Sequence, residues 1–411
     1  MKNYKKLPLA LIALAMTFSA GEALAQGGSN YSAIGVGDFL SASAAAYDAM
    51  GGTASAMPSL HAINPKNPAL WGAVSSTRLQ LGYRFNQNIV STDKAELWQN
   101  NGMINGVTAL FSIDTSLGAA LSLGFVPQTS VNYLTAISFP TELGIAGRTT
   151  YQGSGGIYNA YLGGAIEVIE GVSLGAQFIS GFGTISRAAQ TDIFDAEGAS
   201  YINADDDEIR SFGYKLGGFW QVRNDFALGA YTLSQPIFKV NNNTVFDSQA
   251  MTDTTIMRQY EAKMPLTYGF GASYLVGKFL LGADLDYFAA SGLTYRVEES
   301  AAKYRDALSL SFGFSRLGNR SINADPWDKA TYKAGLNYRN LYYSVNGRDL
   351  NEYSASLGLE MPLPGAWIID AAFTFGARGS TDAGLVREYF GRFTIDMSLG
   401  ETWFKPFKRQ Y

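Results

Sequence analysis

Few residues in this chain combine the types and spacing that chemistry needs. The densest acidic run is Asp205-Asp206-Asp207-Glu208, whose carboxylates could bind calcium. It lacks the alternating spacing and the glycine of a calcium loop, so we expect a solvated loop tip. The chain has one histidine, His61, and no cysteine. Disulfides, cysteine-ligated metals and multi-histidine metal sites are therefore excluded.

His61 is the one possible histidine base in the sequence. No serine nucleophile or carboxylate pattern accompanies it, so we expect a satisfied hydrogen bond in a structural segment instead of catalysis. The Gly-x-x-x-x-Gly-Lys pattern of phosphate loops does not occur. The sequence therefore predicts a protein that is not an enzyme and has no cofactor and no metal.

The composition favours a membrane protein built from strands. Of the 411 residues, 16% are charged, 13% are aromatic and 45 are Gly. The charged fraction is well below the roughly 25% of soluble domains, yet the mean hydropathy of -0.02 argues against apolar membrane helices. After residue 25 no apolar run approaches the roughly 18 residues of a spanning helix. The net charge of -4 leaves no basic footprint for nucleic acid.

The first residues have the pattern of an export signal. Three lysines within the first six residues precede an apolar stretch from Leu7 to Ala20, and Ala23-Leu24-Ala25 matches a cleavage site. The apolar stretch is shorter than the ~20 residues that a spanning helix needs. We expect residues 1–25 to be a secretory signal peptide.

What recurs after the signal is alternation with a period of two, as in a half-buried strand. In the first such segment, Leu79, Leu81 and Tyr83 fall on one face, and Arg78 and Gln80 on the other. About fourteen segments share this pattern: 76–87, 103–114, 117–127, 157–168, 172–185, 209–222, 226–239, 263–276, 279–290, 306–316, 329–340, 352–361, 366–378 and 388–404. Small residues dominate the second face of several segments, which indicates close packing inside.

Short turns and long connections separate these segments, as they do in a membrane barrel. The long connections, which we expect to be loops, are 128–156, 186–208, 240–262, 291–305, 317–328 and 379–387. Each segment is long enough to cross a bilayer, where strands must close into a barrel to pair every backbone group. We predict an all-β, transmembrane antiparallel β-barrel of about 14 strands over residues 75–404, with a short basic tail at 405–411. A soluble sandwich or propeller is the alternative.

The region before the first strand differs from the rest. Residues 26–74 are rich in small residues and nearly neutral, and they contain two Asn-Pro steps, Asn64-Pro65 and Asn67-Pro68. These steps impose extended or turn conformations. The region is too long for a simple tail, so we expect an N-terminal hatch that plugs the lumen.

Several motifs follow one another in a recognisable order. They are Gly35 to Gly37, Ala49-Met50-Gly51-Gly52-Thr53, Asn64-Pro65 with Asn67-Pro68-Ala69, Met264 to Tyr274, and Gly376 through Trp403 to Arg409. The order resembles that of the long-chain fatty-acid transporter family (FadL-type) of outer-membrane barrels, in a divergent branch.

The resemblance implies a fourteen-stranded barrel with a hatch that carries an Asn-Pro-Ala motif at Asn67, Pro68 and Ala69. Members of the family carry fatty acids or aromatic hydrocarbons across the outer membrane. In the family a kink in the third strand opens the wall sideways. Here Gly124 and Pro127 could break that strand, because proline cannot donate to the ladder. The alternative is that Pro127 simply ends it.

The predicted loop after the third strand is unusually apolar. Leu134, Ile137 and Phe139 lie in it, and exposed loops are normally polar. One hypothesis is an extracellular loop that captures a hydrophobic ligand; the other is that these side chains only pack on neighbouring loops.

Together these features predict a passive transporter of hydrophobic small molecules in the outer membrane, with lipid and ligand as partners and a monomeric state. The alternative is a structural or secretion-adaptor barrel (PorV-like) whose loops hold a partner of the secretion machinery. A general diffusion porin fits less well, because it would not carry so long a plug. Ligand identity does not follow from the sequence.

Overall fold

The computed structural model describes most of the chain after the predicted signal. The described residues are 28–40, 44–92, 96–140, 146–194, 200–248, 251–297, 302–321, 323–401 and 403. The predicted signal peptide (1–25) and basic tail (405–411) lie outside them. No helix in these ranges is long and apolar enough to cross a membrane.

Strands form one closed antiparallel wall in which each crossing pairs with the next along the chain. The strands are β2 (Thr77–Ser91), β3 (Glu96–Asp114), β4 (Ala119–Pro127), β5 (Thr129–Pro140), β6 (Ala146–Ile169), β7 (Val172–Phe194), β8 (Ser200–Arg223), β9 (Phe226–Ser234), β10 (Ile237–Ser248), β11 (Met251–Lys263), β12 (Thr267–Val276), β13 (Phe279–Phe288), β14 (Ala302–Tyr304), β15 (Ala307–Arg316), β16 (Thr331–Val345), β17 (Arg348–Pro362), β18 (Trp367–Gly379) and β19 (Arg387–Glu401). The last strand, β19, pairs with β2 and closes the ring. The predicted fold class, a barrel of fourteen antiparallel strands, is confirmed.

Alternation explains why these sequences form a wall. On β2, Leu79 and Leu81 are more than half exposed, whereas Arg78, Gln80 and Arg84 are buried toward the lumen. The outward side chains of the other strands repeat this, with Phe178, Phe212, Phe270, Phe312 and Leu357 among the exposed ones. A belt of exposed aromatic and aliphatic groups is what a bilayer covers.

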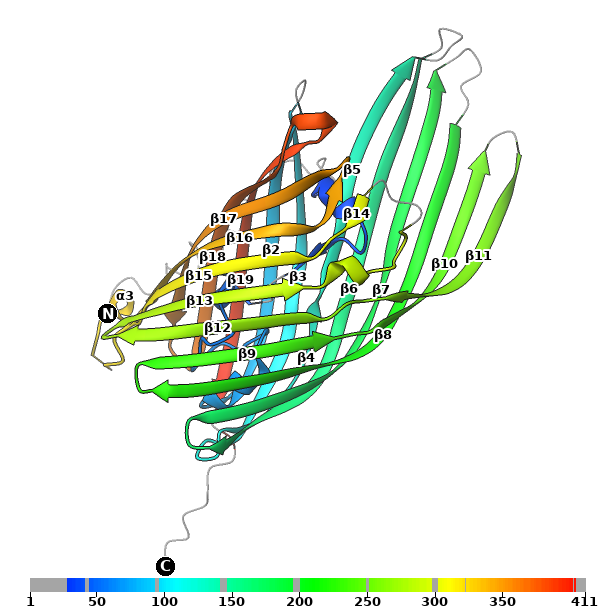
Figure 1. The fold of residues 1–411 in the computed structure, drawn as a ribbon. Coiled ribbons are helices and arrows are strands. Elements are labelled where there is room, and N and C mark those ends of the chain that lie inside the picture. Colours follow the sequence, from blue (N-terminus) through cyan, green and yellow to red (C-terminus); the bar gives the residue numbers. More distant parts are fainter. Residues whose placement is uncertain are drawn as a thin grey trace, which may run out of the picture.

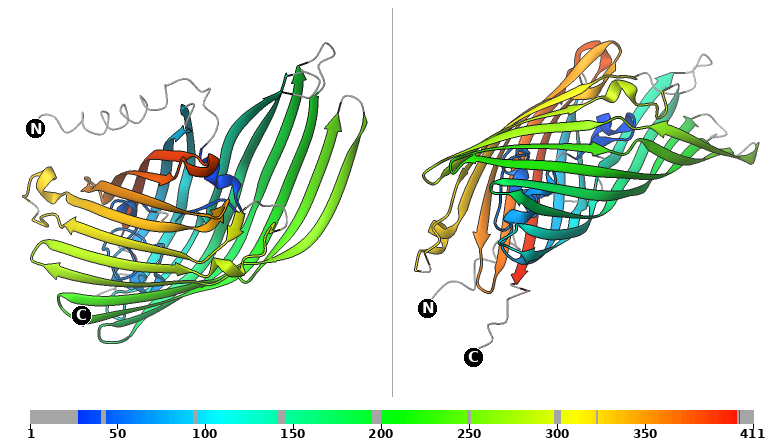
Figure 2. Two further views of the ribbon diagram at one scale, coloured as in Figure 1. Left: turned by 45° about the horizontal axis from the view of Figure 1, so that its top comes forward. Right: turned by 60° about the horizontal axis from the view of Figure 1, so that its bottom comes forward.

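Shorter elements accompany this wall, and one of them, β1, pairs with β5. They are η1 (Asn30–Ala33), β1 (Asp38–Phe39), α2 (Ala45–Asp48), η2 (Pro68–Ala73), η3 (Ala290–Gly292), α3 (Pro326–Lys329) and η4 (Asp382–Gly384). Four of them belong to residues 28–74, which we call the N-terminal segment. Figure 2 shows this segment, in blue, within the curve of the wall. Its side chains are among the most buried of the protein, with Val36, Ala45, Met57 and Asn67 each at 0% exposure.

Glycines on the inner faces of strands let the N-terminal segment approach the wall. A Cβ placed on Gly335 of β16 would lie 2.1 Å from the backbone nitrogen of Gly51. One on Gly229 of β9 would lie 2.0 Å from the carbonyl oxygen of Ser55. Contacts this short leave no room for a side chain, so backbone packs directly on backbone.

Four wall crossings are interrupted at one level, so that eighteen strands make fourteen crossings. The interruptions fall at Gln128 between β4 and β5, at Gln235 and Pro236 between β9 and β10, at 264–266 between β11 and β12, and at 305–306 between β14 and β15. Hydrogen bonds place the first three side by side: Gln128 Nε2 donates to Gln235 Oε1 over 2.5 Å, and the Met264 amide donates to the Pro236 carbonyl over 3.1 Å.

Above this level, β5, β6, β7, β8, β10 and β11 continue as a sheet of their own, which we call the projecting sheet. Figure 1 shows β7, β8, β10 and β11 reaching well beyond the remaining strands. On its first side, β3 pairs with β4 only from Val107 to Asp114, and β5 pairs with β6 and β1 instead. A seam without ladder pairing therefore separates β3 from β5, and the Gln99 side chain of β3 bridges it by donating from Nε2 to the Leu134 carbonyl of β5 over 2.7 Å.

The start of the N-terminal segment holds both sides of this seam. Asp38 pairs with Ser130 of β5, and its carboxylate forms a 2.9 Å ion pair with Arg378 of β18. The Ser29 hydroxyl donates to Glu388 of β19 over 2.8 Å. Residues 28–39 thus connect the projecting sheet to the last two strands of the wall.

The projecting sheet corrects the prediction that 128–156, 186–208 and 240–262 are loops. Most of their described residues are paired strands. Leu134, Ile137 and Phe139, expected in a capture loop, lie on β5. For 186–208 and 240–262 the sequence pattern failed because both faces of the strands are largely polar above the bilayer. In β5, Val131, Tyr133, Ile137 and Phe139 do alternate mainly with polar or small residues, and this alternation indicates a strand.

Candidate ligand chamber in the lumen

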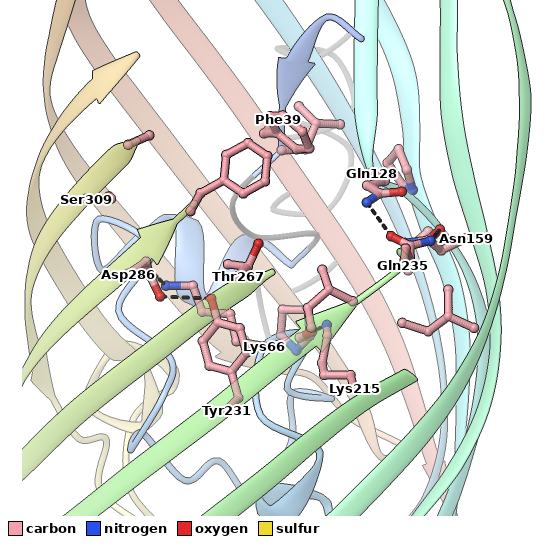
Figure 3. A pocket seen from close by; sticks show the side chains of 18 of the residues that line it. Phe39, Lys66, Gln128, Asn159, Lys215, Tyr231, Gln235, Thr267, Asp286 and Ser309 are labelled. Carbon is pink, nitrogen blue, oxygen red and sulfur yellow. Dashed lines mark hydrogen bonds and ion pairs between the residues drawn. The ribbon is translucent and has the colours of Figure 1, made fainter. Parts of the chain in front are cut away.

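A cavity of about 230 Å³ lies in the lumen at the level of the interruptions. Its lining comes from the N-terminal segment and from strands on all sides of the wall. The lining includes Phe39, Asn64, Pro65, Lys66, Trp71, Thr108, Val126, Pro127, Gln128, Asn159, Tyr161, Ile179, Lys215, Tyr231, Leu233, Gln235, Asp286, Phe288 and Tyr342. Figure 3 shows Phe39 above and Lys66, Lys215 and Tyr231 below.

One side of the chamber carries a compensated charge. Lys66 Nζ lies 2.6 Å from Asp286 and 3.3 Å from Asp284, both on β13. The Tyr231 hydroxyl donates to Asp286 over 2.9 Å. Burial lowers the pKa of Lys66, but the two carboxylates outweigh it and hold that pKa above its usual value. Lys66 is therefore a fixed cation whose charge is already balanced.

The chamber has two further basic residues: Arg339, which is paired with Glu352, and Lys215 of β8. The Nζ of Lys215 donates to the carbonyl oxygen of Pro65 over 2.7 Å. Among the described residues, no carboxylate lies within ion-pair distance of it. A buried ammonium with only a neutral acceptor is costly, so an anionic or strongly accepting ligand atom would gain from placement here.

Neutral amides form the opposite side. Gln235 Nε2 donates to Asn159 Oδ1 over 3.0 Å, and Gln235 Oε1 accepts the Gln128 bond described above. Gln128 Oε1 and the Thr108 hydroxyl are buried without a hydrogen-bond partner among the described residues. These two polar atoms can meet a bound molecule or water.

Aromatic rings fill the remaining lining. Phe39 packs edge-on against Phe288 and Tyr342, with ring centroids 5.0 Å and 5.2 Å apart. Trp71 stacks on Tyr161 at 5.8 Å. The chamber is thus apolar with a few convergent polar groups, which is the usual make-up of a small-molecule site.

Comparison with known families identifies the chain. The family model named BamG matches residues 4–411, nearly the whole sequence. This chain belongs to the BamG family. Among curated proteins, no match is found.

Solved structures similar to this BamG-family chain share its fold at low sequence identity. A FadL homologue of Pseudomonas aeruginosa is 13% identical, with a TM-score of 0.64 over 88% of this chain and 99% of that one. The Pseudomonas putida toluene transporter TodX is 13% identical, with a TM-score of 0.58 over 87% and 98%. The CymD monoaromatic hydrocarbon channel is 12% identical, with a TM-score of 0.57 over 87% and 97%. The FadL-type barrel fold inferred from the sequence is confirmed.

The Asn-Pro motif of the BamG-family chain forms a cluster of local hydrogen bonds beside the chamber. Asn64 Oδ1 accepts the amides of Lys66 and Asn67, and Asn64 Nδ2 donates to the carbonyl of Ala54. Asn67 Oδ1 caps η2 by accepting the Ala69 amide. Asn64 and Pro65 line the chamber.

Asn67, Pro68 and Ala69 face the wall instead. Asn67 Nδ2 donates to the Gly218 carbonyl of β8 over 2.9 Å. A Cβ on Gly175 of β7 would lie 2.4 Å from the backbone of Pro68 and Ala69. These three residues therefore fix the N-terminal segment and do not touch the cavity.

The third-strand residues lie close to the chamber. β4 ends at Pro127, which lines the cavity together with Val126 and Gln128. Gly124 lies lower on β4, paired with Thr108 and Tyr161. The interruption after Pro127 thus brings the seam between β3 and β5 next to the cavity.

The acidic run is not the solvated loop tip expected from the sequence. It lies on β8, and Asp207 is 0% exposed. Asp207 Oδ2 is 3.3 Å from Arg187 and 2.8 Å from Arg296, and it accepts the Tyr295 hydroxyl. Burial follows from strand alternation, which turns every second carboxylate inward. No metal-binding cluster of His, Cys, Asp or Glu occurs in the described part of the chain.

The sequence reasoning missed Lys66, Lys215 and the acidic pair Asp284 and Asp286. A sequence pattern could have identified the acidic pair. Charged residues two apart in an otherwise apolar strand, as in Asp284-Leu285-Asp286, mark an inward face that meets polar partners. His61, expected to be a structural hydrogen-bonding residue, has its Nδ1 2.8 Å from Glu360 Oε1.

Proposed function

We propose that this BamG-family barrel is an outer-membrane channel for hydrophobic small molecules and that the lumen chamber is its binding site. The carrying observation is an aromatic cavity that holds an uncompensated lysine, Lys215, beside the interruption after Pro127. The fold is shared with the CymD monoaromatic hydrocarbon channel and the toluene transporter TodX, which supports the same class of ligand.

The chamber favours a small amphipathic ligand. Its volume of about 230 Å³ is below the roughly 300–1,000 Å³ of sites for drug-sized molecules. It therefore fits a compact molecule, or the polar end of a longer one. The apolar part would pack on Phe39 and Trp71, and an acceptor atom would meet Lys215.

The contacts of the N-terminal segment favour a gated route. Its backbone packs on Gly229 and Gly335, so it occupies the lumen between β9 and β16. A ligand in the chamber is adjacent to the seam through Val126 and Gln128. We infer that the seam is the route toward the membrane and that the N-terminal segment is the gate on the other side.

Lys215→Gln tests the role of the lysine. With 4-phenylbutyrate and its neutral amide as probes, we expect the variant to bind the carboxylate about tenfold more weakly, as loss of one charged hydrogen bond predicts. Binding of the amide should stay within about twofold. Isothermal titration of the detergent-purified barrel measures both.

Two further variants sharpen this test. Lys239→Gln removes an exposed lysine from the outer face of β10 and should change neither affinity. Phe39→Ala should weaken both probes. Equal loss of both probes in Lys215→Gln would contradict a charge-reading role, and no binding of either probe to the unaltered barrel would contradict the chamber as a ligand site.

A further inference from the structure

Over residues 255–259, the outer edge of β11 has no strand partner in the described part of the chain. Its ladder with β10 runs from Ile237 opposite Lys263 up to Ser248 opposite Met251. No other described strand pairs with β11, whereas β12, its continuation, pairs with both β9 and β13. At its lower end, β11 is covered where the Lys263 amide donates to the Thr294 hydroxyl over 2.8 Å and the Thr294 amide donates to the Lys263 carbonyl over 3.2 Å.

The middle of this edge, residues 255–259, has few of the usual protections, with Arg258 as its one charged side chain. Natural proteins blunt exposed edges with proline, bulges, lysine or a covering loop. The stretch 255–259, Thr-Ile-Met-Arg-Gln, contains no proline or glycine, and its register with β10 is unbroken. Every second residue of an edge strand directs its amide and carbonyl outward. Met257 is 80% exposed, the highest value among the large apolar side chains of the described residues.

Lipid does not cover the edge. Next to it, the outward side chains of β10 are Ile237 at the interruption and then Lys239, Asn241 and Asn243 above it. The change from apolar to polar places the upper part of β10, and β11 beside it, in water. In water, a strand edge of this kind is a template for another strand.

The lower inner face of the projecting sheet packs in a hydrophobic core through Val131, Val240 and Ala262, whereas its upper part carries exposed apolar groups. Parity and register place Ile137, Tyr151, Tyr201, Phe246 and Ile256 on the face that carries Asp207. Each of them is at least 36% exposed. Exposed aromatic and aliphatic groups on one face of a water-exposed sheet mark an interaction surface.

We propose that the outer edge of β11 is a docking site for an extended strand of another polypeptide on the water-exposed side of the membrane. Only a backbone in β conformation satisfies a row of alternating amides and carbonyls, so the edge itself specifies the occupant. This site is independent of the small-molecule chamber.

The side chains of β11 define the sequence that would fit. Cross-strand neighbours interact directly on each face. On the inner face, an apolar residue of the docked strand would pack beside Ile256, and an acidic residue would pair with Arg258. On the outer face, Met257 calls for an apolar neighbour. The docked strand would therefore alternate so that apolar residues fall on both faces and one carboxylate falls beside Arg258.

Photo-crosslinking in native outer membranes tests the proposal. A benzophenone amino acid replaces Thr255, Met257 or Gln259 in separate variants, and Asn241 of β10, paired on both sides, is the matched control position. Strand addition predicts crosslinks from the three β11 positions to one segment of one other protein. The crosslinked residue moves by about two along that segment at each step, and Asn241 gives no such series.

Two proline variants distinguish loss of strand docking from loss of barrel stability. Because alternate amides point outward, one of Met257→Pro and Arg258→Pro removes an outward donor, and the other removes a donor to β10. With the crosslinker at Gln259, the outward proline should cut crosslink yield at least about tenfold without lowering the thermal unfolding temperature. The other proline should lower that temperature.

Each remaining outcome overturns the proposal. Crosslinks to a second copy of this chain would identify an edge-to-edge dimer. Crosslinks to another segment of the same chain would show that the edge is covered internally. Crosslinks scattered over several proteins without a register, or yields that neither proline changes, would show that β11 adds no strand.

Discussion

Asp284→Ala should release the N-terminal segment from the wall. Asp284 Oδ2 accepts the amides of Ala54 and Ser55 at 2.8 Å and 2.9 Å, the Ser55 hydroxyl at 2.8 Å, and Lys66 at 3.3 Å. The side chain of Asp284 is fully buried. Breaking a buried ionic network by removing one partner costs on the order of 3–5 kcal/mol. We expect a raised single-channel conductance in planar bilayers and faster proteolysis of residues 28–74.

A matched control uses an exposed ion pair. Asp225 lies 3.2 Å from Arg223 in the turn between β8 and β9, and both side chains are exposed. Asp225→Ala should leave conductance and proteolysis unchanged, because exposed pairs contribute little. If Asp284→Ala kept the conductance of the unaltered barrel, the N-terminal segment would not be held as the contacts indicate.

Gly335→Val should displace the N-terminal segment by steric conflict. The added Cβ would lie 2.1 Å from the backbone of Met50 and Gly51, and neither backbone can move as a flexible side chain would. Gly51 and Gly52 have φ of 67° and 86°, so the turn they form has few alternatives. We expect a loss of at least about 3 kcal/mol in unfolding free energy, at or beyond the upper end of overpacking costs.

Gly391→Val is the control for this prediction. Gly391 is in β19, and a Cβ added to it would have Phe373 Cζ as its nearest atom, at 3.7 Å, which is an ordinary contact. Valine favours strands, so the control barrel should be as stable as the unaltered one. Denaturant unfolding followed by tryptophan fluorescence compares the two variants. Equal stability of both would contradict direct packing of the N-terminal segment on β16.

The wall of the barrel was predictable because a strand that crosses the bilayer must place apolar residues at every second position. Every described strand that crosses the belt turns large apolar groups outward, so alternation such as Leu79, Leu81 and Tyr83 could be read directly. The number of crossings followed from counting such segments. Above the bilayer, outward-facing residues need not be apolar. β7 and β8 continue with Asp192 and Asp206 on the outward face, and their ladder was mistaken for loops.

The chamber was harder to predict, because it depends on which inward residues meet. Lys333 of β16 lies 2.8 Å from Glu360 and 3.2 Å from Asp370, and these carboxylates come from the next two strands. Lys215 has no such partner among the described residues and contacts Pro65. Strand alternation predicts that both lysines point inward. It does not predict which lysine is paired with a carboxylate, because that pairing depends on strand register and on the path of the N-terminal segment.

The enclosed N-terminal segment also determines the order in which the barrel can be completed. Residues 28–74 come first in the described chain, yet their binding groups include Asp284 of β13, Glu360 of β17 and Asp396 of β19, which come late. The ring closes when β19 pairs with β2. The first part of the wall-bound chain to emerge therefore acquires its final position among the last. Its full set of contacts can form only once β13, β17 and β19 are in place.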